Sequence, residues 1–221
     1  MIKAIIFDLD DTLYSEITFV RSGFIAVARY AAINFKVSEK EFYKKLINRF
    51  NSDGRGKIFD NILTEYNLFS KRRVALLVNC YQRHIPNIVL YSEVRSILHA
   101  LKKKYGLGII TDGKGMVQRK KVRALKLKFF FDCIMYTHDY GKEKPHPFSF
   151  KKMLLHFQVQ PEEAVYIGNN PYKDFIGARR VGLKTIRILR GDFKFLKLNK
   201  KYEADYCLQN LKNLPKLLTV L

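Results

Sequence analysis

Residues 3–13 read KAIIFDLDDTL, a short apolar run that ends in a cluster of acidic residues. A run of this length, rich in isoleucine and ended by polar residues, predicts a buried β-strand. Asp8 and Asp10 lie two positions apart, so on an extended chain their side chains point to the same side. Two carboxylates this close repel each other unless a cation neutralises them or one of them carries a proton. This stretch therefore predicts a strand that delivers paired carboxylates to a site.

Further apolar runs repeat this pattern along the rest of the chain, each followed by a polar or glycine-containing turn. They span residues 107–111, 133–136, 164–167 and 184–188, with one more short strand expected near 205–208. Amphipathic segments lie between most of them, at 92–104, 116–127, 147–157 and 174–181, and a last helix is expected after residue 213. Short apolar strands that alternate with helices predict parallel βαβ units. We therefore expect an α/β fold, a Rossmann-like, doubly wound and mostly parallel sheet.

One interval, from residue 15 to residue 88, breaks the alternation of strands and helices. Its spacing of apolar residues predicts helices at 17–32, 38–50, 58–66 and 71–84, with no clear strand. A crossover between parallel strands needs only about a dozen residues. We therefore expect a helical cap domain at 15–88, inserted into an α/β core domain made of 1–14 and 89–221.

The composition limits the class of protein. Hydrophobic residues make up 48% of the 221 residues and aromatic residues 14%, which argues against a disordered chain. Cys80, Cys133 and Cys207 are far apart and form no CxxC pair, which disfavours a zinc site or a disulfide framework. No stretch resembles a signal peptide or a membrane span. We expect a cytoplasmic protein with reduced thiols.

The charge is strongly positive, at +21 from 41 Lys and Arg against 20 Asp and Glu. A field of this sign attracts anions such as phosphorylated substrates or nucleic acid. The densest basic stretches are residues 102–104 and 119–128. Such runs more often form solvated helix faces, and no nucleic-acid-binding motif accompanies them. Nucleic acid is therefore a possible partner that the sequence does not favour.

Polar residues follow the predicted strands where ligands bind in open parallel sheets, beyond the carboxyl ends. They read Thr111-Asp112-Gly113 after one strand and Gly168-Asn169-Asn170 after another. A hydroxyl and backbone N–H groups at a helix start would hold a phosphate, although Thr-Asp-Gly alone is only a turn signal. Lys144, in a loop stiffened by two prolines, could neutralise phosphoryl charge.

Taken together, these residues resemble the haloacid dehalogenase-like phosphatases. FDLDDTL resembles their first motif, Asp-x-Asp-x-Thr after an apolar strand, and Thr111 their second. Lys144-Pro145 is similar to the third motif, and Gly168 to Asp174 to the fourth. The four appear in the family's order, and the helical interval resembles the cap that many members carry.

The resemblance implies a Mg²⁺-dependent phosphatase that hydrolyses a phosphomonoester of a small metabolite. It implies that Asp8 attacks phosphorus and forms an aspartyl-phosphate, and that Asp10 acts as acid and base. Thr111 and Lys144 would stabilise the phosphoryl oxygens, with Asp112 and Gly113 beside them. Dehalogenase members lack an acid at the position of Asp10, so its presence favours phosphate chemistry.

The fourth motif departs from the family pattern, because Asn169 stands where an aspartate is usual. The resemblance implies Mg²⁺ bound by Asp8, the Asp10 carbonyl and an acid of this motif. We therefore expect a weak site completed by Asn169 or by Asp174. Two alternatives stay open: a catalytically weak or inactive binding protein, and a phosphatase or binder acting on nucleic-acid ends.

The sequence Gly54-Arg55-Gly56-Lys57 lies between two helices of the expected cap. In related capped members such a loop faces the active site, so the resemblance implies that Arg55 or Lys57 contacts the distal part of the substrate. An exposed turn explains the glycines equally well. The sequence predicts neither the identity of the substrate nor the oligomeric state.

Overall fold

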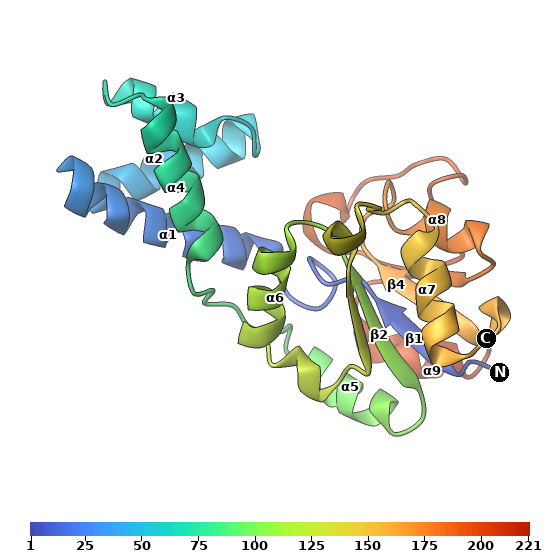
Figure 1. Ribbon diagram of the computed structural model, residues 1–221. Helices are drawn as coiled ribbons and strands as arrows, with labels where there is room; N and C mark the ends of the chain where they lie inside the picture. The colour runs from blue at the N-terminus through green and yellow to red at the C-terminus, as the bar shows by residue number, and fades with distance from the viewer. The chain divides into compact units, whose positions relative to one another are not determined.

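The computed structural model describes residues 1–221, which form two compact units (Figure 1). One unit comprises residues 1–16 and 89–221, and we call it the α/β unit. The other comprises residues 17–88, and we call it the helical unit. None of the helices is both long and apolar enough to cross a membrane.

The α/β unit is built on a parallel sheet of six strands in the order β3-β2-β1-β4-β5-β6. Its strands are β1 (Ala4–Phe7), β2 (Gly106–Thr111), β3 (Cys133–Tyr136), β4 (Ala164–Gly168), β5 (Lys184–Ile188) and β6 (Tyr206–Leu208). The strand order reverses direction at β1, which is the arrangement that places a ligand site beyond the ends of β1 and β4. The prediction of a Rossmann-like parallel sheet is confirmed.

Helices cover both faces of this sheet (Figure 1). They are α5 (Val94–Lys102), α6 (Gly115–Ala124), α7 (Phe148–Phe157), α8 (Phe175–Arg180) and α9 (Leu214–Leu218). The loops of this unit contain short 3-10 turns: η1 (Leu127–Phe129), η2 (Thr137–Tyr140), η3 (Pro161–Glu163), η4 (Gly191–Phe193) and η5 (Leu211–Asn213). Figure 1 shows α7 and α8 on one face and α5 and α6 on the other. Ile6 and Tyr166 of the sheet pack with Phe150 and Met153 of α7 in a buried core.

The helical unit contains α1 (Glu16–Phe35), α2 (Glu39–Asp53), α3 (Ile58–Glu65) and α4 (Lys71–Arg83). One face of α1 is buried at helical spacing, through Val20, Phe24, Val27, Ala28 and Ala31. Ser38 and Ser70 accept hydrogen bonds from backbone N–H groups at the starts of α2 and α4. Such N-caps satisfy donors that the helix itself leaves free.

The chain leaves the sheet and returns to it at neighbouring points of the α/β unit. Tyr14 forms an antiparallel bridge with Leu90, and the Tyr91 N–H donates to the Leu13 carbonyl over 3.1 Å. The segments before and after the helical unit are therefore held side by side by backbone hydrogen bonds.

Candidate active site

Asp8 is the first residue after β1, in the middle of the sheet. Its backbone N–H donates to the Ile167 carbonyl over 2.8 Å, which continues the pairing of β1 with β4. One carboxylate oxygen, Oδ1, lies 2.6 Å from Lys144 Nζ. The other, Oδ2, accepts a 3.3 Å hydrogen bond from Thr12 Oγ1. The strand thus fixes the carboxylate, and a single weak donor leaves Oδ2 able to react.

Lys144 reaches this carboxylate from the loop before α7 and is buried. Its ammonium also lies 2.8 Å from Asp174 Oδ1 and 3.0 Å from the Tyr166 hydroxyl. Burial lowers the pKa of Lys144, but the charges of Asp174 and Asp8 outweigh burial and hold the pKa well above its ordinary value. The site therefore contains a permanent cation between two carboxylates.

The electrostatics of Asp8 follow from this sharing of one lysine. Burial raises the pKa of Asp8 to about 8; Lys144 acts against the rise, while Asp174 and Asp10 add to it. One positive charge cannot neutralise two buried carboxylates, so the site is short of positive charge around Asp8. A further cation beside Asp8 would favour its ionised form.

Asp10 has a different set of partners. Its Oδ1 accepts from Lys121 Nζ over 2.7 Å and from the Tyr14 hydroxyl, and its Oδ2 accepts from Gln118 Nε2 over 2.8 Å. Burial raises the pKa of Asp10, but the Lys121 charge and the hydrogen bonds from Lys121, Tyr14 and Gln118 lower it below its ordinary value overall. Lys121 is itself only 4% exposed.

The second predicted motif lies next to this carboxylate. Thr111 is buried at the end of β2, and its hydroxyl accepts a hydrogen bond from Gln118 Nε2, the same group that binds Asp10. Gly113 has a φ of +100°, which disfavours any residue with a side chain. Gly113 thus allows the chain to turn between the end of β2 and the start of α6.

The Asp112 side chain holds the neighbouring loop. Its Oδ1 accepts from the Lys144 backbone N–H over 3.1 Å and from Thr137 Oγ1 over 2.8 Å. Its Oδ2 lies 3.3 Å from Lys173 Nζ. These contacts fix the start of the Lys144 loop to the end of β2.

The fourth motif, with Asn169 and Asp174, follows β4, the strand that pairs with β1. The Asn169 amide donates to the Arg190 carbonyl over 3.5 Å, which turns its Oδ1 away from that carbonyl. Asp174 is fully buried and both its oxygens are occupied, Oδ2 by the Asn170 N–H and Oδ1 by Lys144 and Tyr166. No group of three His, Cys, Asp or Glu side chains is arranged to hold a metal. A metal ion here would need neutral oxygens as well as carboxylates.

Four residues at this site were missed by the sequence analysis: Tyr14, Gln118, Lys121 and Tyr166. Gln118 and Lys121 lie three apart on α6, which puts them on one helix face. Only the structure shows that this face is buried, because the many Lys and Arg residues at 119–128 are typical of a solvated helix. Tyr166 stands between apolar residues of β4 and carries no signal in the sequence either.

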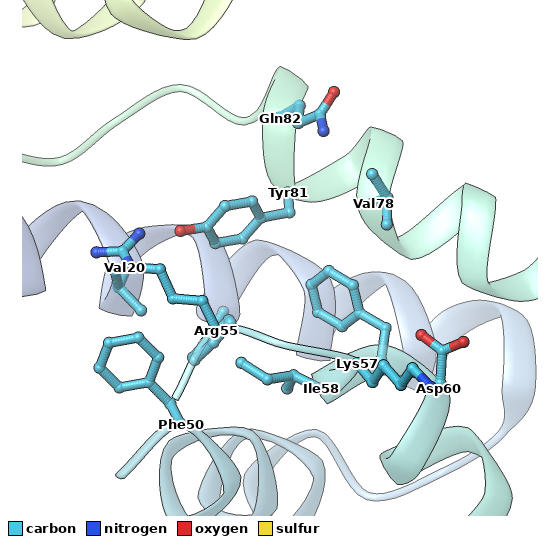
Figure 2. Close-up of a pocket in the computed structure, with 11 residues that line it drawn as sticks. Val20, Phe50, Arg55, Lys57, Ile58, Asp60, Val78, Tyr81 and Gln82 are labelled. Carbon is cyan, nitrogen blue, oxygen red and sulfur yellow. The ribbon is translucent and has the colours of Figure 1, made fainter. Parts of the chain in front are cut away.

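Arg55 and Lys57 lie in the helical unit, where they line a pocket of about 300 Å³ (Figure 2). The pocket also has aromatic walls, including Phe50 and Tyr81. The Arg55 guanidinium lies 5.7 Å from the centre of the Phe50 ring. Lys57 immediately precedes α3 and has a left-handed φ of 51°. The structure brings the two basic residues together at one concave surface.

The fold and the four motifs define the class of the protein. Residues 5–188 match the family model described as haloacid dehalogenase-like hydrolase. The chain belongs to this family, and the prediction that it is a hydrolase of this superfamily is confirmed.

Individual relatives are similar over nearly the whole chain. A glyceraldehyde 3-phosphate phosphatase of Pyrococcus furiosus is 36% identical, with 100% of this chain and 93% of the relative covered. A protein of the same name from Methanocaldococcus jannaschii is 31% identical, covering 97% and 96%. Among solved structures, the HAD hydrolase YfnB of Bacillus subtilis bound to magnesium has a TM-score of 0.72 at 22% identity, covering 98% of both chains. This last likeness shows the fold.

Proposed function

We propose that the chain is a Mg²⁺-dependent phosphatase that hydrolyses a phosphomonoester of a small metabolite through an aspartyl-phosphate. The observation that carries the proposal is the pair of carboxylates, Asp8 and Asp10, which contact two different buried lysines, Lys144 and Lys121. The relatives named glyceraldehyde 3-phosphate phosphatase, and a phosphoserine phosphatase of Thermus thermophilus at 27% identity, support a small phosphorylated substrate.

The chemistry uses the two carboxylates in turn. The negative charge of a bound phosphoryl group raises the pKa of Asp10 from its lowered value in the free protein, so that Asp10 can carry a proton in the complex. Asp8 Oδ2 attacks phosphorus, the bond from phosphorus to the leaving oxygen breaks, and protonated Asp10 gives that oxygen its proton. A water then attacks the aspartyl-phosphate, and Asp10 takes the proton from it. Inorganic phosphate leaves and Asp8 is regenerated. Lys144 Nζ, the backbone N–H groups around Gly113 and the Thr111 hydroxyl stabilise the charge on the phosphoryl oxygens.

The donor set fits Mg²⁺, which prefers oxygen ligands. Asp8 offers a carboxylate, Asp10 a backbone carbonyl, and Asn169 the amide oxygen that its bond to Arg190 turns away from that carbonyl. Asp174 is the weaker candidate for a direct ligand, since protein donors occupy both its oxygens. When bound, Mg²⁺ supplies positive charge that holds Asp8 ionised and offsets charge on the phosphoryl group.

We propose that Arg55 or Lys57 contacts the distal end of the substrate. Two cations at an aromatic pocket suit an anionic or hydroxylated group. The test compares Arg55→Ala on the best substrate and on p-nitrophenyl phosphate, which lacks such a group. A loss confined to the best substrate supports the contact, and an equal loss on both contradicts it.

The deciding experiment is a panel of phosphorylated metabolites, glyceraldehyde 3-phosphate and phosphoserine among them, with phosphate release measured with and without Mg²⁺. We expect turnover that EDTA abolishes and Mg²⁺ restores. The second candidate is a binding protein without turnover, favoured by the amide at Asn169. It predicts no phosphate release from any panel member, even at millimolar Mg²⁺.

The three cysteines, Cys80, Cys133 and Cys207, are free thiols. Free thiols are typical of a reducing compartment, which supports a cytoplasmic location for the enzyme.

A further inference from the structure

The exposed side of α6 borders a hollow in the α/β unit that has no part in the proposed hydrolysis. It has a volume of about 600 Å³ and lies between α6, η1 and β3, the strand at the edge of the sheet. Its lining includes Arg119, Arg123, Lys126, Lys128, Phe129 and Tyr136. We call this surface the basic groove. Its size is in the range of small-ligand sites.

The charge of the basic groove is almost entirely positive. Its one acidic lining residue, Asp132, already accepts a hydrogen bond from the Leu107 backbone N–H over 2.9 Å. Arg123, Lys126 and Lys128 are exposed and carry no carboxylate partner. Because these three charges are close together and unneutralised, the groove favours an anion with several charges over a single small one.

The fold joins the two densest basic stretches of the chain at this groove. Lys102, at the end of α5, donates to the Phe129 carbonyl over 2.7 Å. Lys103 and Lys104, which follow it, are exposed. Residues 102–104 and 119–128 are separate in the sequence, yet the Lys102 side chain reaches η1, which lines the groove. The positive surface therefore extends beyond the groove itself.

Aromatic rings stand among these cations. Phe129 is 75% exposed, so its ring is open to a ligand. Arg119 stacks on the Tyr136 ring at 4.3 Å from its centre, and Asp139 holds the guanidinium in place. An exposed ring such as that of Phe129, beside several cations, suits an anion that carries flat aromatic groups along a charged backbone.

We propose that the basic groove binds single-stranded nucleic acid, with Arg123 and Lys128 contacting phosphates and Phe129 stacking on a base. An acidic protein segment would satisfy the cations but would leave Phe129 exposed without a flat partner. A duplex presents its phosphates but keeps its bases stacked inside, away from the ring. The full chain net charge of +21 strengthens attraction to any polyanion, so the assignment to this groove must be tested against that general field.

The test measures the fluorescence anisotropy of a labelled 15-nucleotide oligo(dT) with the full chain between 50 and 200 mM KCl. We expect a Kd of about 1–100 µM that weakens steeply with salt, because bound phosphates release counterions. The double variant Arg123→Glu with Lys128→Glu should lower the affinity at least tenfold and make the salt dependence shallower.

The matched control is Lys40→Glu with Lys44→Glu, the same change of charge on exposed residues of α2. It should change the affinity by less than about threefold. Phe129→Ala should weaken binding about threefold or more without altering the salt dependence, since it removes stacking and no charge. Melting curves by circular dichroism establish that each variant is folded.

Several outcomes would overturn the proposal. Absence of saturable binding at 50 mM KCl would do so, as would equal effects of the groove and control variants. Poly-L-glutamate that competes as well as unlabelled oligo(dT) would make the groove a general polyanion site. Equal affinity for a duplex of the same length would remove the role of Phe129. None of these results bears on the proposed phosphatase activity, which is measured separately.

Discussion

Asp8 and Asp10 lie two residues apart, each beside a buried lysine, yet the protein gives them opposite electrostatic properties. Lys144 lies between Asp8 and Asp174, within 2.8 Å of both. Lys121 lies 2.7 Å from Asp10, and its next carboxylate, Glu16, is 4.0 Å away. Lys144 therefore pairs with two carboxylates, whereas Lys121 pairs almost entirely with Asp10.

The difference explains the direction of each pKa shift. Burial raises the pKa of both carboxyl groups, and the partners decide the net result. At Asp8 the shared lysine does not compensate, and the pKa rises to about 8. At Asp10 the charge of Lys121 and the hydrogen bonds from Tyr14 and Gln118 outweigh burial, and the pKa of Asp10 falls. The neighbourhood of Asp8 is thus prepared for an additional cation, and that of Asp10 is complete within the protein.

The largest expected effect comes from removing the attacking oxygen. Asp8→Asn should lower kcat at least about a thousandfold, roughly 4 kcal/mol in the barrier, because no other carboxylate takes its position. Steady-state kinetics measure this, with exposed Asp192→Asn as the matched control. A variant that keeps more than about a tenth of the wild-type kcat, and still melts like wild type, would refute the role of Asp8.

The next largest effect tests whether Lys121 serves Asp10 in the way that Lys144 serves Asp8. Lys121→Met should leave Asp10 poorly placed to protonate the leaving oxygen, lowering kcat/KM for an alkyl phosphate about a hundredfold. For p-nitrophenyl phosphate the loss should stay below about tenfold, since nitrophenolate leaves without a proton. Exposed Lys151→Met is the control. Equal losses on the two substrates would mean that Lys121 serves only to maintain the structure.

A smaller effect tests the deficit of charge at Asp8. Asn169→Asp should bind Mg²⁺ about tenfold more tightly, or about 1.4 kcal/mol, because a carboxylate replaces a neutral amide. Calorimetric titration of both proteins, alongside turnover, measures it. If the wild type binds no Mg²⁺ at millimolar concentration and the variant gains both binding and turnover, the natural chain is inactive.

The smallest effect concerns the shared lysine. Tyr166→Phe removes one hydroxyl that contacts both Lys144 and Asp174 while keeping the ring. Two ion pairs still hold the ammonium, so we expect kcat to fall about three- to tenfold with little change in KM. A loss larger than that of Lys121→Met on the same alkyl phosphate would reverse the comparison.

The strands were predictable because each is a short apolar run. The polar residues after them were predictable because each run stops at the carboxyl end of its strand. Asp8 and Thr111 were marked in this way, whereas Lys144 was found from the prolines of its loop and from the resemblance to the third motif. The structure brings Lys144 against Asp8 across 136 positions of sequence. The sharing of Lys144 with Asp174 was not predictable, since it depends on where a loop side chain meets a helix start. Lys121 was hidden for another reason: within residues 119–128 it looks like one more solvated lysine, but its helix face is buried.

The bridge between Tyr14 and Leu90 bears on how the helical insertion of this protein could be replaced during evolution. The two ends of the helical insertion are anchored to each other by the sheet-bearing unit, so that unit does not depend on the insertion to close the gap. A short turn or a different bundle could span the same two anchors while the catalytic chemistry stays intact. If the helical unit contacts the substrate as proposed, exchanging this insertion would change the substrate and leave the sheet intact.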